Sequence, residues 1–178
     1  MLSNVRRYAR WLATAGAAGT IAAVSTVSPA SADTAQPGHV YRITTNASLA
    51  LDVSGASQGE NAAVIQWPVN GGPNQSWRLQ QLTDGSDYII NLNSGKCLSV
   101  NGPSLDAGAA LVQYTCYGAP TQKWYLEPVN SGTEYTIRSA ASTNVVDVPG
   151  GSVSWGTQLE QWYANAGSNQ QFFFTTLA

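Results

Sequence analysis

The chain has 178 residues, of which only 10% are charged, with eight Lys and Arg against ten Asp and Glu. Its formal net charge of −2 and its lack of a Lys/Arg cluster in the main body exclude the electrostatic footprint that a phosphate backbone requires, so we expect no nucleic acid partner. With two cysteines, one histidine, no Cys-x-x-Cys and no nucleotide-binding fingerprint, we also expect no metal and no cofactor.

The first segment of the chain is typical of a secretory leader. Three arginines within the first ten residues precede a mostly apolar run over residues 11–27, and an Ala-x-Ala sequence ends at Ala32. A membrane anchor is the alternative, but the run is short and weakly apolar beside the roughly 20 residues that a spanning helix needs. We predict a signal peptide over residues 1–32, a short lead over 33–38, and a secreted protein with no inserted membrane segment.

From residue 39 onward the sequence repeats three times. Tyr41, Tyr88 and Tyr135 are spaced by 47 residues and each opens a copy. Each copy ends in a Gln-x-aromatic triplet, and such self-similarity indicates one supersecondary unit used three times. The triplets are Gln75-Ser76-Trp77, Gln122-Lys123-Trp124 and Gln170-Gln171-Phe172. The predicted repeats cover about residues 39–85, 86–132 and 133–178.

Each copy contains four short runs that are rich in β-branched and aromatic residues, as strands are. Gly, Asn, Ser, Asp and Pro separate the runs, and no stretch after residue 40 holds a helical period. This pattern predicts one all-β domain of about twelve strands, and closure into a barrel would remove its exposed edges. The runs are 40–43, 50–53, 63–67, 77–79, 88–90, 97–100, 111–114, 124–126, 135–138, 145–148, 159–162 and 172–174.

Both cysteines, Cys97 and Cys116, lie in the second copy with 18 residues between them. In an exported protein an even pair indicates a disulfide. A loop of this size would stabilise the fold by about 3 kcal/mol in the chain-entropy model.

A threefold repeat of this length that ends in Gln-x-Trp resembles the ricin B-type lectin family, whose fold is the β-trefoil. The likeness covers residues 39–178. It implies a non-catalytic, secreted protein that binds glycans, and members of the family often bind galactose-type or xylan-type sugars. The Cys pair that the family carries within a repeat corresponds here to Cys97 and Cys116. We expect a monomer.

Each copy can be tested for the residues that a sugar site needs. An aromatic ring stacks on the apolar face of a pyranose, while carboxylate and amide groups bond its hydroxyls. In the family an acidic residue, an aromatic and an Asn form the pocket, and the first and third copies carry all three at spacings of 15 and 7 residues. The predicted carbohydrate-binding residues are Asp52, Trp67, Asn74 and Gln75 in the first copy and Asp147, Trp162, Asn169 and Gln170 in the third.

The second copy keeps the spacing but has lost its carboxylate and its Asn. It therefore predicts a degenerate second site with weak binding or none. The residues at the corresponding positions are Ser99, Tyr114, Thr121 and Gln122.

One position departs from the family pattern. Many members carry a Gln two residues before the stacking aromatic, where this chain has Ile65, Val112 and Glu160. Glutamines stand one residue before the aromatic instead, and adjacent side chains of a strand face opposite ways, so we expect no replacement. These glutamines are Gln66, Gln113 and Gln161. The departure leaves the identity of the sugar open.

Several prominent residues have a structural explanation. The repeat places Trp77, Trp124 and Phe172 around a pseudo-threefold axis, so we expect them in the core. The three triplet glutamines more simply brace loops than contact a ligand, and the two site aspartates could satisfy turn amides. Trp155 has no counterpart in the other copies, so it either extends the third site or covers the barrel.

An enzyme is the less favoured alternative. Glycosidases need two carboxylates about 5 to 9.5 Å apart, and no two acids recur together in the repeats. A second alternative is a β-trefoil that binds a protein, such as a hydrolase inhibitor, through the loop over residues 150–155. Loss of binding in parallel at Trp67 and Trp162 would indicate sugar, whereas loss only at this loop would indicate a protein partner.

Overall fold

The computed structural model describes residues 35–177, so the predicted signal peptide lies outside the described residues. The strands of the first repeat are β1 Val40–Thr44, β2 Ala50–Val53, β3 Val64–Trp67 and β4 Trp77–Gln81. Those of the second are β5 Asp87–Asn91, β6 Cys97–Val100, β7 Ala109–Tyr114 and β8 Trp124–Val129. Those of the third are β9 Glu134–Ser139, β10 Val145–Asp147, β11 Glu160–Trp162 and β12 Phe173–Thr176. Six single 3₁₀ turns connect them: η1 Ser54–Ala56, η2 Pro73–Gln75, η3 Pro120–Gln122, η4 Asn130–Gly132, η5 Pro149–Gly151 and η6 Ser168–Gln170.

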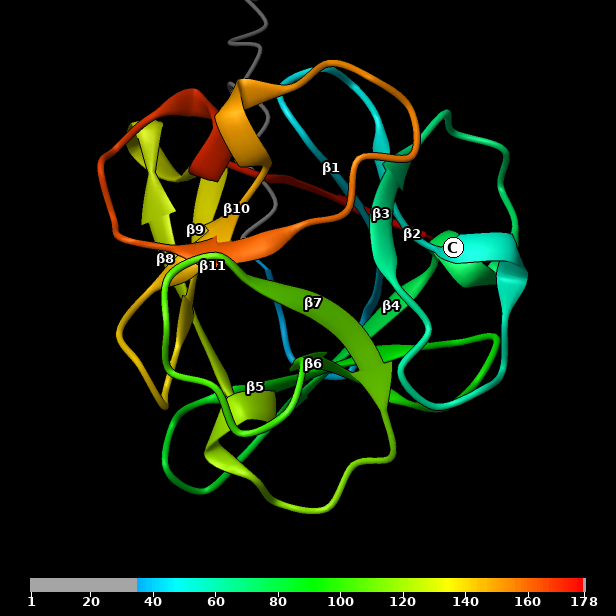
Figure 1. The fold of residues 1–178 in the computed structure, drawn as a ribbon, viewed down its shortest axis with the longest axis vertical. Coiled ribbons are helices and arrows are strands. Elements are labelled where there is room, and N and C mark those ends of the chain that lie inside the picture. The colour runs from blue at the N-terminus through cyan, green and yellow to red at the C-terminus, as the bar shows by residue number, and fades with distance from the viewer. Residues whose placement is uncertain (1–34, 178) are drawn as a thin grey trace, which may run out of the picture. The chain divides into compact units, whose positions relative to one another are not determined.

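All of the strand pairs are antiparallel, and the pairing joins the two ends of the domain. β1 pairs with both β4 and β12, and β5 pairs with both β4 and β8. The strands β3, β7 and β11 meet on one face through the β7–β11 pair and isolated bridges. Figure 1 looks onto this face, where the three strands surround a common centre. The fold is a β-trefoil of three repeats, as predicted.

The aromatic residues of the three triplets form the centre of the core. Trp77, Trp124 and Phe172 are all fully buried, which confirms their predicted place. Each indole N–H donates a hydrogen bond of 3.0 Å to a backbone carbonyl, from Trp77 to Leu51 and from Trp124 to Leu98. The core therefore satisfies the polar atom of each buried tryptophan within its own repeat.

A disulfide joins Cys97 in β6 to Cys116 in the loop after β7, and it confirms the predicted pairing. Within residues 35–177 no set of three His, Cys, Asp or Glu side chains is arranged to hold a metal ion. The same residues include no helix with the length and apolar character needed to cross a bilayer.

The predicted equivalence of Tyr88 with Tyr41 and Tyr135 is wrong by one residue. Tyr41 pairs with Trp77 and Tyr135 with Phe172, but the residue that pairs with Trp124 is Asp87. The turn between β1 and β2 is one residue shorter than the β5–β6 and β9–β10 turns. Between the first and second repeats, a spacing of 47 residues therefore misses the true counterpart by one residue for positions before this turn, but not for positions after it. Tyr88 therefore faces outward, and a carboxyl occupies a buried position where the other repeats have a tyrosine.

Asp87 makes the stability of the domain depend on pH. It is 8% exposed, its Oδ1 has no hydrogen-bond partner among the described residues, and burial raises its pKa from 3.8. The folded state binds this proton more tightly than the unfolded state, so stability falls as the pH rises from the unfolded-state pKa to above the folded-state pKa. We expect Asp87→Asn to remove this fall, measured by urea unfolding at several pH values. An unchanged pH dependence would contradict the assignment.

A buried glutamine from each repeat holds a loop of the repeat before it in a cyclic order. Gln66 donates through Nε2 to the carbonyls of Ser152 (2.8 Å) and Ser154 (3.0 Å) in the third repeat. Gln113 and Gln161 make the same two bonds, to Ser57 and Gly59 and to Ser104 and Asp106. All three glutamines are fully buried, and none of them lines the cavity that contains Trp67, Tyr114 or Trp162, as predicted from the strand alternation.

The three glutamines differ in the hydrogen-bond partner of their side-chain oxygen, Oε1. The Oε1 atoms of Gln113 and Gln161 each accept a 2.7 Å hydrogen bond from a serine hydroxyl, Ser94 and Ser142 respectively. Among the described residues, Oε1 of Gln66 has no partner. The residue that corresponds to these serines is Ala47, because each precedes the turn residue with positive φ. Ala47 and Gln66 line a cavity of about 150 Å³.

We expect Ala47→Ser to stabilise the domain by about 0.5–1.5 kcal/mol, since it supplies a donor to a buried, unpartnered acceptor. Chemical denaturation with urea measures the change. Ser94→Ala and Ser142→Ala are the matched controls, and they should destabilise the domain by about 1–3 kcal/mol because each leaves a glutamine oxygen unpaired. A lower stability for Ala47→Ser would show that the shorter β1–β2 turn cannot bring the hydroxyl to Gln66.

Candidate functional site

Each repeat has a cavity against the hairpin of its second and third strands, which are β2–β3, β6–β7 and β10–β11. The cavities have volumes of about 410, 430 and 480 Å³ in the first, second and third repeats. Asp52, Trp67 and Asn74 line the first cavity together, so residues spaced by 15 and 7 in the sequence come together at one place. The third cavity contains their counterparts Asp147, Trp162 and Asn169.

In the first cavity, two side-chain amides fix the carboxylate of Asp52. Asn74 donates through Nδ2 (2.9 Å) and Gln75 through Nε2 (2.8 Å), and both bonds end on Oδ2. No described residue donates to Oδ1. Burial raises the pKa of Asp52, while the bonds from Gln75 and Asn74 oppose this rise. The arrangement leaves one carboxylate oxygen free to accept a hydrogen bond from a ligand.

The third cavity reproduces this geometry. Asn169 and Gln170 each donate to Oδ2 of Asp147 at 2.8 Å. As with Asp52, burial raises the pKa of Asp147 against the opposing bonds from Gln170 and Asn169. The two repeats therefore present the same acceptor in the same setting.

The triplet glutamines lie behind the carboxylates. Gln75 and Gln170 are each 1% exposed and do not line the cavities. Besides the carboxylate, each bonds its preceding loop: Gln75 Nε2 donates to the carbonyl of Pro68 (2.9 Å) and Gln170 Nε2 to that of Tyr163 (2.9 Å). Their place agrees with the predicted bracing of the loop, and each orients the aspartate beside it.

The two predicted stacking aromatics stand at the rims of their cavities. Trp67 ends β3 and Trp162 ends β11, and their exposed fractions are 40% and 39%. Trp77 and Trp124 are fully buried, whereas a half-exposed indole beside a cavity that contains a carboxylate offers a flat apolar surface to a ligand.

In the second repeat the cavity is present without a carboxylate. The hydroxyl of Ser99 donates to the carbonyl of Val100 (3.1 Å), and Gln122 holds the loop by donating to the carbonyl of Thr115 (2.8 Å). Thr121 is buried and does not line this cavity. Tyr114 lines it together with Tyr117, whose ring centroid lies 5.7 Å away. The weak or absent binding predicted for this repeat stays a prediction.

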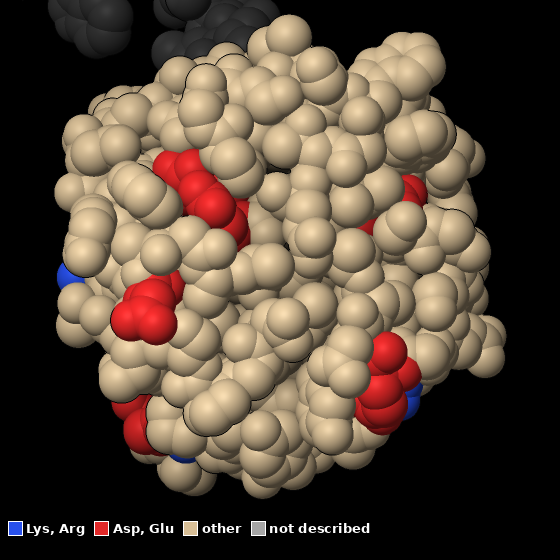
Figure 2. All heavy atoms as spheres, in the orientation of Figure 1, with Lys and Arg blue, Asp and Glu red and all other residues tan. Residues whose placement is uncertain are grey.

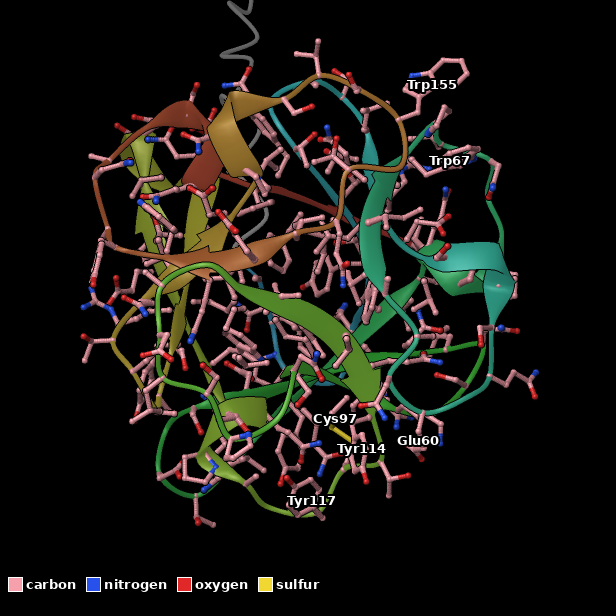
Figure 3. The ribbon with its side chains drawn as sticks, viewed as in Figure 1. Glu60, Trp67, Cys97, Tyr114, Tyr117 and Trp155 are labelled. Carbon is pink, nitrogen blue, oxygen red and sulfur yellow. A yellow bond between two sulfur atoms is a disulfide. The ribbon has the colours of Figure 1, made fainter. Side chains whose placement is uncertain are left out.

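Of the two alternatives for Trp155, extension of the third site is wrong. Its ring lies against Trp67 of the first repeat, with centroids 6.1 Å apart and planes inclined by 60°. Figure 3 shows the two indoles side by side at the edge of the domain. A comparison of repeat positions could not reveal this neighbour, because the contact joins the third repeat to the first.

The third cavity contains a second carboxylate, so the expectation that no two acids share a cavity is wrong there. Glu160 lines it with Asp147, and the two are paired across β10 and β11. Burial raises the pKa of Glu160, and the charge of Asp147 raises it further. In the first repeat the corresponding residue is Ile65, which pairs with Asp52. The two cavities thus differ in charge.

The sequence matches the family described as ricin-type beta-trefoil lectin domain-like over residues 26–114, 88–162 and 120–178. The chain belongs to this family. Among solved structures it is similar to the designed threefold-symmetric protein ThreeFoil, with 34% identity, a TM-score of 0.75, and coverage of 78% of this chain and 99% of that one. No curated protein is similar enough to count as a match.

Two natural proteins of known structure are also similar to this chain. An exo-β-1,3-galactanase from Clostridium thermocellum is 30% identical, with a TM-score of 0.75, and the match covers 78% of this chain but 30% of the galactanase. A ricin B-like lectin from Macrolepiota procera, solved in complex with lactose, is 22% identical, with a TM-score of 0.68 and coverage of 79% and 96%. The latter likeness shows the fold alone.

Proposed function

We propose that this family member is a secreted, non-catalytic lectin that binds galactose-type or xylan-type glycans through its first and third repeats. The observation that carries the proposal is the aspartate held on one oxygen by two amides beside a half-exposed tryptophan, present in both repeats. The family membership and the lactose bound by the Macrolepiota procera lectin support it.

The chemistry of each site suits a sugar. The free oxygen of the aspartate accepts a hydroxyl proton in a charge-assisted bond, and the fixed Oδ2 prevents the carboxylate from turning away. The indole of Trp67 or Trp162 covers the apolar face of the sugar ring. Figure 2 shows the same face of the domain as Figure 1, and on it the side chains of Asp and Glu form separate patches among mostly uncharged residues. Such a surface suits a neutral glycan better than a polyanion.

Catalysis is not part of the proposal, although the third cavity contains two carboxylates. Glycosidases place their carboxyl groups on either side of the scissile bond. Asp147 and Glu160 come from paired positions on adjacent strands, so they lie on one wall of the cavity. The similar galactanase offers no argument for an enzyme, since the match covers 30% of its chain.

Binding to a multivalent glycan should exceed binding to a free monosaccharide. A single shallow site of this kind gives a dissociation constant near 1 mM, or about −4 kcal/mol. Two such sites on one rigid domain raise the apparent affinity for a polymer through effective concentration.

A glycan array tests the proposal. We expect the mature protein to bind one coherent class of glycans and the double variant Trp67→Ala/Trp162→Ala to lose that binding, because both stacking surfaces are gone. Tyr125→Ala is the matched control, since Tyr125 is a similarly exposed aromatic (38%) that lines none of the three cavities. A blank array from folded protein would overturn the proposal and favour a protein partner.

A further inference from the structure

Building on the proposed function, we propose that Trp155, carried on a loop of the third repeat, gives the first site a second sugar subsite. The first site then selects glycans of two or more rings. The argument rests on the contact of Trp155 with Trp67, on the bonds that hold its loop, and on the residues at the corresponding positions of the other repeats.

The loop that carries Trp155 is fixed to the first repeat at several points. The backbone N–H of Gly156 donates to the carbonyl of Gln66 (2.8 Å), and the N–H of Gln66 donates to the carbonyl of Thr157 (2.9 Å). The side chain of Gln66 adds its bonds to Ser152 and Ser154. Trp155 therefore stands in a set position, and binding does not have to order its backbone.

The position of Trp155 suits a ligand that extends beyond the cavity. Trp155 does not line the first cavity but lies against the ring of Trp67, which does. It is 66% exposed, and Val153 on the same loop is 73% exposed, so the indole contributes little to the core. A sugar ring stacked on Trp67 thus brings the next sugar ring of the same glycan towards Trp155 (Figure 3).

The cyclic glutamine contacts identify the corresponding residues in the other repeats. Ser154, Gly59 and Asp106 are the second loop residues bonded by Gln66, Gln113 and Gln161. The next residue is Trp155 beside the first site, Glu60 beside the second and Ala107 beside the third. The three loops are equivalent, yet each one brings a different side chain to the site of the next repeat.

The second and third sites have no aromatic at this loop position, and the exposed rings beside Tyr114 and Trp162, Tyr117 and Tyr163, come from the same repeat as the site. Glu60 pairs with Lys96 (2.6 Å) and accepts hydrogen bonds from the hydroxyl and N–H of Thr115. These hydrogen bonds, most of all the one from Lys96, lower the pKa of Glu60 to about 2. Figure 3 shows Glu60 near Tyr114. At the third site, Ala107 is followed by Gly108, which lies close to Trp162, and neither side chain offers an aromatic ring.

The test compares single rings with short chains at each site in isolation. Trp162→Ala leaves the first site to be measured alone, and Trp67→Ala leaves the third. The probes are galactose with lactose and xylose with xylotriose, titrated by calorimetry. We expect the first site to prefer the longer member of the pair it binds by about five- to tenfold, the factor that one added aromatic contact contributes. The same pairs of sugars titrated at the third site give the baseline for a variant of its loop.

Variants of the loop decide the role of Trp155. Trp155→Ala should remove the preference of the first site for the longer sugar, and Ala107→Trp should raise the preference of the third site above its own baseline. Val153→Ala is the matched control on the same loop and should change neither. Equal preferences with and without Trp155 would overturn the inference while leaving the lectin intact. If none of the four sugars binds the unaltered protein, the proposed function fails, and the inference fails with it.

Discussion

Replacing Asp52 with alanine should abolish sugar binding at the first site, and Asp147→Ala should do the same at the third. Each change removes the acceptor and leaves two amides, Asn74 and Gln75 or Asn169 and Gln170, without their shared partner. Loss of a charge-assisted hydrogen bond lowers affinity by about 1.5–3 kcal/mol, or about 10- to 100-fold. From a millimolar start, that loss removes measurable binding.

Titration of galactose or xylose followed by nuclear magnetic resonance measures the effect site by site. Each single variant should keep the signals of one site, and the double variant should keep none. Ser99→Ala is the matched control in the second repeat and should change nothing, because its hydroxyl already bonds the carbonyl of Val100. A loss of binding on Ser99→Ala would show that the second site is active. Retained binding at the first site in Asp52→Ala would contradict the role of the carboxylate.

The largest loss of stability should follow Trp124→Ala. The indole is fully buried at the centre of the barrel and donates to the carbonyl of Leu98 (3.0 Å). Truncation of such a residue creates a large cavity and costs about 3–5 kcal/mol of unfolding free energy. Urea denaturation at neutral pH measures it.

Trp124→Phe gives a graded comparison. The third repeat already has Phe172 at the corresponding position, so the size and shape of a phenyl ring are compatible with this part of the core. The expected loss is about 1–3 kcal/mol, largely because the carbonyl of Leu98 then has no donor. Tyr125→Ala, at the exposed neighbour, should change stability by less than about 0.5 kcal/mol. A loss below about 1 kcal/mol in Trp124→Ala would show that the core collapses around the missing ring.

Spacing predicted an all-β fold of three repeats, because Gln-x-aromatic triplets and short apolar runs recur at nearly constant intervals, and the resemblance to the ricin B-type family supplied the β-trefoil. The same resemblance predicted that Asp52, Trp67 and Asn74 meet, and the repeated spacing extended that prediction to the third copy. The spacing misled at Tyr88. A shorter β1–β2 turn offset the count by one residue, and only the pairing of Asp87 with Trp124 reveals the true equivalence.

Contacts between repeats lay beyond prediction from the repeat pattern. Trp155 reaches Trp67 across a boundary that the internal alignment treats as the end of one unit and the start of another. Glu160 departs from the family pattern, but its pairing with Asp147 depends on the register of β10 and β11. Ile65 pairs with Asp52 at the corresponding position of the first repeat. Knowledge of that pairing would have located Glu160 beside Asp147.

The cyclic order of the glutamine contacts has a consequence for how the domain could have been assembled. Every repeat carries both a buried glutamine and the loop that the next glutamine binds, so the contact runs head to tail and closes after three units. Head-to-tail contacts of this kind are the ones that build rings from separate subunits. A single repeat carries both the glutamine and the loop that the glutamine of the next repeat binds. Three separate copies would therefore make all of these hydrogen bonds only as a closed trimer.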